Sequence, residues 1–332
     1  MAVSMIPPDA APAFLDQAGW TNARIEPLAV DASFRRYFRV ASGERSSVLM
    51  DAPPPNEDPR PFITMAEWLT ERGFSAPQIL HRDLAHGLVL LEDLGNDRMR
   101  EAVDAGLASE METYRGVVDV LIALRDHKPP ALMPASVDTY CSEVELFLDW
   151  YCPECGLDVD RAGFAAAWRA LLEPVMANLS EPVVVLRDYH AENIMLLDGK
   201  TGLARYGLLD FQDALSGHPA YDLASMLQDA RRDVSPNVES AMLRHYRDRT
   251  GVGDEFEAAY WALAAQRNMR ILGLFVRLWR RDNKPHYTSF QTRMWGLMER
   301  DLAHPALAGM KSWFDTNVPD EKRARWWQDL TL

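Results

Sequence analysis

Short runs of apolar and β-branched residues dominate the first 95 positions of the chain. They predict five strands, at 23–30, 34–40, 46–50, 78–80 and 87–91. Between the third and fourth strands, apolar residues recur at helical spacing from Phe62 to Leu69, and Gly73 ends that helix. This region is therefore predicted to be a small sheet accompanied by one helix.

From about residue 97 the apolar positions follow a helical period instead. Amphipathic helices are predicted at 110–127, 142–150, 161–178, 219–230, 238–249 and 256–281. Three short strands interrupt them, at 183–186, 194–197 and 206–209. The fold class is therefore predicted to be α+β and bilobal. A small β-rich N-lobe would span residues 1–95, and a larger helical C-lobe would span residues 96–332.

Three polar residues accompany the short strands of the second region. Asp188 follows the first strand, Asn193 precedes the second, and Asp210 follows the third. A lone loop aspartate is usually a cap or a turn former, but the ordered set matches the needs of phosphoryl transfer from a metal-bound nucleotide. One carboxylate receives the proton of the acceptor hydroxyl, while an amide oxygen and a second carboxylate hold Mg²⁺ against the phosphates. We expect Asp188 to be the catalytic base and Asn193 and Asp210 to be metal ligands.

Composition restricts the partners. The chain has 332 residues, of which 48% are hydrophobic, and its formal net charge of −14 argues against nucleic acid as a partner. No apolar run reaches the length of about 18 residues that a membrane span needs, and the first residues do not have the pattern of a signal peptide. The three cysteines are expected to be free thiols. We expect a cytoplasmic monomer that does not bind a membrane.

The ordered motifs resemble those of the aminoglycoside phosphotransferase and choline kinase family, small-molecule relatives of protein kinases. That family carries a His-Gly-Asp-Leu-His-Pro-Gly-Asn loop, an Asp-Phe-Gly-like metal site and a downstream Asp-Leu-Ala. The matching residues in this chain are Asp188, His190, Asn193, Asp210 and Asp222. The resemblance implies a bilobal protein-kinase-like fold that uses ATP and Mg²⁺. It also implies that Asp222 supports the catalytic loop by accepting its backbone N–H groups.

Other segments are similar to one branch, the anomeric sugar kinases of bacterial cell-wall recycling. These segments are residues 31–40, 49–53, 91–95, 210–213 and 266–268, and the similarity extends over residues 10–315. The resemblance implies phosphorylation of N-acetylmuramate and N-acetylglucosamine at the anomeric hydroxyl. Two alternatives stay open: a kinase for an aminoglycoside, choline or homoserine, and a catalytically silent, nucleotide-binding regulator.

Two positions depart from the family pattern. Leu186 stands where the catalytic loop usually has histidine, and the strand at 46–50 lacks the lysine that contacts the nucleotide phosphates. We expect Arg35 or Arg36 to replace that lysine, because guanidinium groups pair well with phosphate oxygens; the alternative is that both lie on a strand surface.

The remaining nucleotide contacts are assigned to backbone groups. Ser33 belongs to a loop of small residues whose backbone N–H groups can approach phosphate. The resemblance implies that Glu92 and Leu94, in the linker between the lobes, contribute backbone groups to the adenine edge.

The acceptor site is expected around Asp188. Arg187 and His190 flank it in sequence, and Asp213 follows Asp210 by three positions, where it would bind sugar hydroxyls, hold a second metal or cap a turn. N-acetylmuramate has a lactyl carboxylate, so an arginine is expected to bind it. We expect Arg267, which lies in a polar cluster of an otherwise apolar helix; the alternative is a solvated or ion-paired helix face.

Overall fold

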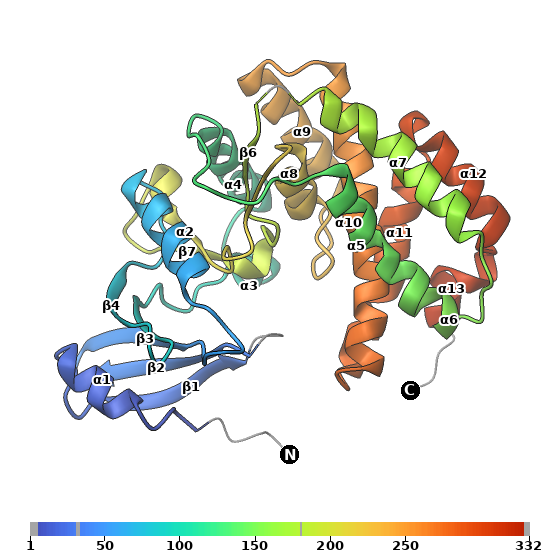
Figure 1. The fold of residues 1–332 in the computed structure, drawn as a ribbon. Coiled ribbons are helices and arrows are strands. Elements are labelled where there is room, and N and C mark those ends of the chain that lie inside the picture. Colours follow the sequence, from blue (N-terminus) through green and yellow to red (C-terminus); the bar gives the residue numbers. More distant parts are fainter. Residues whose placement is uncertain (1–5, 31–33, 180, 329–332) are drawn as a thin grey trace. The chain divides into compact units, whose positions relative to one another are not determined.

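The computed structural model describes residues 6–30, 34–179 and 181–328, which form two compact units (Figure 1). The first unit comprises Met1–Ala105 and Asn193–Asp213, and the second comprises Gly106–Glu192 and Ala214–Leu332. Neither unit is continuous in sequence. The short segment Asn193–Asp213 belongs to the first unit and interrupts the second.

A five-stranded antiparallel sheet forms the centre of the first unit. Its strands, in the spatial order β1-β2-β3-β5-β4, are β1 (Arg24–Val30), β2 (Arg36–Ser42), β3 (Arg45–Asp51), β5 (Leu88–Glu92) and β4 (Ile79–Asp83). All five predicted strands are confirmed, with shifted ends. Short apolar runs were a sufficient signal because consecutive residues of β3 and β5 are buried.

Helices accompany this sheet. Helix α1 (Ala11–Gln17) buries Phe14 in a cluster with Phe38, Leu49 and Leu90, which lie opposite one another across β2, β3 and β5. The sequence analysis did not predict α1, which is only seven residues long. The predicted helix is confirmed as α2 (Arg60–Glu71), and α3 (Met99–Asp104) completes the N-terminal part of the unit.

The central segment is a hairpin of β7 (Ile194–Leu196) and β8 (Tyr206–Leu208). Both of its edges bond to the N-terminal segment. The Leu208 N–H donates to the Ser75 carbonyl at 2.7 Å, and the Leu196 N–H donates to the Asp97 carbonyl at 2.7 Å. These bonds explain why the hairpin belongs to the first unit although residues 106–192 separate it from the N-terminal segment.

The second unit is mainly helical. Its helices are α4 (Glu110–Leu124), α5 (Val137–Leu146), α6 (Cys152–Glu154), α7 (Arg161–Ala177), α8 (Ala220–Leu227), α9 (Pro236–Thr250), α10 (Asp254–Arg280), α11 (Gln291–Leu302), α12 (Ala308–Asn317) and α13 (Ala324–Gln328). A two-stranded pair, β6 (Val183–Val185) and β9 (Leu215–Gly217), accompanies them. The 27-residue α10 is the central helix, and α5, α8 and α11 pack against it (Figure 1). A strand-rich unit and a helical unit confirm the predicted fold class.

Several predicted bounds were wrong. The helix predicted at 142–150 begins at Val137, where the Ser136 hydroxyl caps it by accepting the Thr139 N–H at 3.0 Å, and it ends in a π-helical turn at Phe147–Tyr151. The β-branched residues of its first turn hid this start, since they have low helix propensity. Strand β9 and helices α11–α13 were not predicted at all.

Two expectations from composition concern the cysteines and membrane spans. The three cysteines are free. Among the described residues, no helix is long and apolar enough to cross a membrane.

Candidate active site

The loop that carries the predicted base Asp188 follows β6 in the second unit, and a buried carboxylate holds its start. The Leu186 N–H donates to Asp222 Oδ2 at 2.5 Å, and the Arg187 N–H donates to Asp222 Oδ1 at 2.9 Å. Burial raises the pKa of Asp222 to about 7, against the lowering effect of these two N–H groups. The expected supporting role of Asp222 is confirmed, and it fixes the backbone immediately before Asp188.

A second carboxylate, Asp229, holds the middle of the same loop. Its Oδ2 accepts the Ala191 N–H at 3.1 Å, and its Oδ1 accepts the Arg231 N–H at 2.8 Å. Asp229 was not predicted from the sequence. It lies two residues beyond the end of α8.

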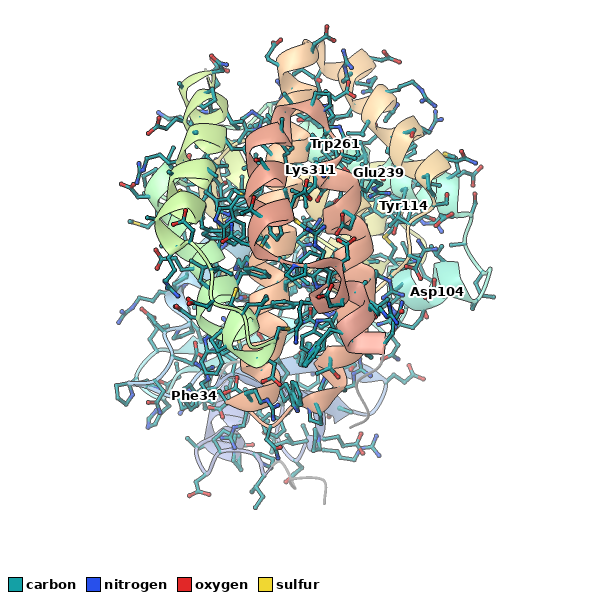
Figure 2. All side chains as sticks on the ribbon, turned by 90° about the vertical axis from the view of Figure 1, so that its right-hand side faces the viewer. Phe34, Asp104, Tyr114, Glu239, Trp261 and Lys311 are labelled. Atoms are coloured by element: carbon teal, nitrogen blue, oxygen red, sulfur yellow. The ribbon has the colours of Figure 1, made fainter. Side chains whose placement is uncertain are left out.

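A buried polar network lies behind Asp229. The side chain of Gln228 accepts from Asn268 at 2.7 Å and donates to Asp301 at 2.9 Å and to Glu239 at 3.3 Å. Figure 2 marks Glu239, which α9 contributes to this interior. Burial raises the pKa of Asp301 to about 8. The network joins α8, α9, α10 and α11 at the residue next to Asp229, so it supports the loop from inside.

His190 and Glu192 both contact Arg231. The Nη1 of Arg231 lies 3.2 Å from His190 Nε2, and its Nε lies 3.0 Å from Glu192 Oε2. The His190 ring is buried. This arrangement favours a supporting role for His190 within the loop.

Arg267 lies on α10 with only 3% of its surface exposed. Its Nη1 donates to the Gln228 carbonyl at 3.5 Å. Burial lowers its pKa, and the charges of Tyr221 and Asp188 oppose that effect. Arg267 is therefore a buried guanidinium within electrostatic reach of Asp188.

The two predicted metal ligands lie together in the first unit. The Leu209 N–H donates to the Asn193 carbonyl at 3.0 Å, and Asn193 Nδ2 lies 3.4 Å from Asp210 Oδ2. Asp210 has a left-handed backbone with φ +59°, a conformation that often marks functional positions. The next residue, Phe211, is buried and stacks on Phe62 of α2 with ring centres 5.0 Å apart, which anchors the Asp210 loop.

These ligands suit Mg²⁺. Among the described residues, no group of three or more His, Cys, Asp or Glu side chains could hold a metal without help. Mg²⁺ needs no such group, because it usually binds one or two carboxylates and takes its other oxygens from substrate phosphates and water. The Asp210 carboxylate and the Asn193 amide oxygen fit this pattern. Asp213 is exposed, and Gln212 donates both to it at 3.4 Å and to Asp210 at 2.8 Å.

The structure separates the two candidate arginines. Arg36 forms an ion pair with the buried Asp51, with Nη2 2.5 Å and Nε 2.8 Å from Oδ2. Arg35 is only 7% exposed, and its Nη2 lies 3.8 Å from Asp210 Oδ1. Arg35 is therefore the one that lies beside the predicted metal carboxylate.

The residues assigned to nucleotide backbone contacts lie at the end of β5. The Glu92 N–H donates to the Gln78 carbonyl at 2.9 Å, and Leu94 packs within 3.0 Å of the position that a Cβ at Gly207 would occupy. Asp93, between them, pairs with Arg39 of β2 at 2.8 Å. Ser33 lies outside the described residues.

Comparisons with known proteins identify the family of the chain. Residues 24–260 match the phosphotransferase enzyme family. A protein of Caulobacter vibrioides named N-acetylmuramate/N-acetylglucosamine kinase is 37% identical, over 94% of this chain and 96% of that protein. The protein of the same name from Pseudomonas aeruginosa is 36% identical, over 87% and 88%.

Solved structures share the fold. A choline/ethanolamine kinase family protein from Mesorhizobium loti has a TM-score of 0.60 at 15% identity, over 92% of this chain and 99% of that one. The ADP-bound aminoglycoside phosphotransferase APH(2'')-Ib has a TM-score of 0.59 at 13% identity, over 89% and 97%. The chain belongs to the phosphotransferase enzyme family and has its kinase-like fold, so the expectation of an enzyme is confirmed.

Proposed function

We propose that the protein is an ATP- and Mg²⁺-dependent kinase that phosphorylates N-acetylmuramate and N-acetylglucosamine at the anomeric hydroxyl, in the cytoplasm and as part of peptidoglycan recycling. The observation that carries this proposal is the similarity to relatives that are named for these two sugars. The Caulobacter vibrioides protein is 37% identical over 94% of this chain and 96% of its own length. The buried arginine near Asp188 supports an acceptor that includes a carboxylate.

The proposed reaction is a single displacement. The anomeric oxygen of the sugar attacks the γ-phosphorus of ATP, the bond from that phosphorus to the β–γ bridging oxygen breaks, and ADP leaves. Asp188 accepts the proton of the anomeric hydroxyl. An anomeric hydroxyl is more acidic than an ordinary alcohol, so the demand on this base is moderate. Asp222 and Asp229 hold the loop that presents it.

Asn193 and Asp210 would hold Mg²⁺, which neutralises charge on the phosphates when it is bound. Asp213 is proposed as a ligand for a second metal or for sugar hydroxyls. Backbone groups of Ser33, Glu92 and Leu94 are assigned to ATP.

Arg35 is proposed to replace the missing lysine. Replacing it with alanine is expected to raise the KM for ATP and lower kcat, by about 10-fold or more in kcat/KM, since one charge-assisted phosphate contact is worth at least 1.4 kcal/mol. Arg36→Ala is the matched variant. It leaves the buried Asp51 without its ion-pair partner, so it is expected to reduce stability by about 1–3 kcal/mol. Steady-state kinetics and thermal unfolding of both variants distinguish the two roles; a kinetic loss only in Arg36→Ala would reverse the assignment.

Arg267 is proposed to bind the lactyl carboxylate of N-acetylmuramate. Arg267→Ala is expected to reduce kcat/KM for N-acetylmuramate about 10- to 100-fold more than for N-acetylglucosamine, which lacks that carboxylate. N-acetylglucosamine thus serves as an internal control for damage to the fold. Equal losses of kcat/KM with both sugars would show that Arg267 supports the site but does not bind the lactyl carboxylate.

The function itself is tested with labelled ATP and Mg²⁺ against a panel of amino sugars, aminoglycosides, choline and homoserine. Formation of a sugar 1-phosphate that depends on Asp188 is the expected result. Transfer to an aminoglycoside, choline or homoserine instead would assign the enzyme to another acceptor, and transfer to none would contradict the proposal.

A further inference from the structure

Arg187, the residue before Asp188, has an unusual backbone conformation. Its φ is +69°, in the left-handed region that side chains other than glycine rarely adopt. Among the described residues, the other non-glycine positions with positive φ are asparagines and an aspartate, which tolerate this region best. The family loop has glycine at this position. An arginine here therefore costs free energy that glycine would not, and its side chain must offset that cost.

The side chain of Arg187 joins the loop to two helices. Its Nη2 donates to Glu143 Oε1 of α5 in a half-buried ion pair. The other oxygen of Glu143 accepts from Gln266 Nε2 of α10 at 3.1 Å, and Gln266 also donates to the Tyr140 carbonyl at 3.1 Å. The Glu143 carboxylate is thus fixed on both sides, and it holds the guanidinium in one place.

The backbone of Arg187 is held as well. Its N–H donates to Asp222 at 2.9 Å, and its carbonyl accepts from the Ser225 hydroxyl at 3.4 Å. Side chain, N–H and carbonyl are therefore each bonded to a different residue. Because Asp188 is the next residue, any rotation at Arg187 turns its carboxylate directly.

We propose that Arg187 and Glu143 are positioning residues, which hold the strained backbone before Asp188 and so set the direction of its carboxylate. The inference rests on the proposed function and extends it, because it gives Arg187, which the sequence predicted at the acceptor site, a role in orienting Asp188. Glu143 lies 44 positions upstream of Arg187, and the sequence analysis did not identify it.

The first test compares Arg187→Gly with Arg187→Ala. Both variants lose the ion pair, but only alanine keeps the steric cost of a left-handed backbone. We expect both to lower kcat about 100-fold, the loss typical of a misplaced catalytic group, with the KM for ATP unchanged. We also expect Arg187→Gly to unfold at a higher temperature than Arg187→Ala. A glycine variant with wild-type kcat would overturn the proposal.

The second test is a double-mutant cycle of Arg187→Ala and Glu143→Gln. If the two residues act through one ion pair, the double variant loses no more kcat than the worse single variant. Losses that multiply would show independent roles and would contradict the pairing. Arg169→Ala is the matched control, because it breaks an exposed ion pair with Asp138 that also joins a neighbouring helix to α5, and we expect it to leave kcat unchanged.

The same measurements separate this inference from the proposed function. If the wild-type protein phosphorylates the sugars while Arg187→Gly and Glu143→Gln keep wild-type kcat, only the positioning role fails. If another acceptor is the substrate, the variants are compared on that acceptor, and the proposed sugar specificity alone fails. A wild-type protein that transfers phosphate to no acceptor would overturn both.

Discussion

Asp188→Asn is expected to lower kcat for both sugars by about 10²- to 10³-fold, with the KM for ATP and the unfolding temperature nearly unchanged. Asparagine preserves the size of the side chain but cannot accept the hydroxyl proton. General base catalysis typically contributes about 10²- to 10⁴-fold. The lower part of that range applies here, because an anomeric hydroxyl gives up its proton more readily than an ordinary alcohol. Steady-state kinetics and thermal unfolding measure the two quantities.

Asp198→Asn is the matched control for this variant. Asp198 lies exposed after β7, so the same chemical change there should leave kcat at its wild-type value. The assignment of Asp188 as the base requires that Asp188→Asn lowers kcat without lowering the unfolding temperature. If Asp188→Asn unfolds at a clearly lower temperature or keeps most of its kcat, Asp188 is a structural residue of the loop.

Asp210→Asn is expected to lower kcat about 10³-fold and to remove the effect of Mg²⁺ on nucleotide binding. The reason is that a bound metal supplies several kcal/mol of charge stabilisation to the transition state, and each 1.36 kcal/mol is tenfold in rate. Asparagine is the suitable replacement because it tolerates the left-handed backbone of Asp210, at φ +59°, where alanine would add strain. Calorimetric titration with ATP, with and without Mg²⁺, gives a readout that does not depend on turnover.

Asp213→Asn distinguishes the two carboxylates of this segment. Both accept from Gln212, but only Asp210 lies beside Asn193. We expect Asp213→Asn to keep the dependence of ATP binding on Mg²⁺. Asp210→Asn protein that still binds ATP more tightly with Mg²⁺ would show that the metal is held elsewhere.

Local patterns predicted much of the fold. Short runs of apolar and β-branched residues identified β1 to β5, and a period of 3.6 identified the long helices, including α10. Two of the elements that were not predicted are too short to establish a period, because helix α1 has seven residues and β9 has three. Their formation depends on what they pack against.

The residues that support the Asp188 loop could also be predicted only in part from the sequence. Asp222 could be anticipated from its motif, and its two backbone hydrogen bonds confirm it. Glu143 could not, because on α5 it resembles any polar residue of an amphipathic helix. Its role arises only when α5 and α10 come together and place its carboxylate between Arg187 and Gln266.

The sequence by itself determined the residue types of the chemistry and their order: Asp188, Asn193 and Asp210 at the ends of short strands. Their spacing is local, and a strand followed by a polar turn is a local structure. Only the tertiary structure decided that Arg36 forms an ion pair with Asp51, while Arg35 lies beside Asp210. The two arginines are adjacent in sequence. Successive residues at the start of a strand point in different directions, and the partners that they meet belong to distant segments.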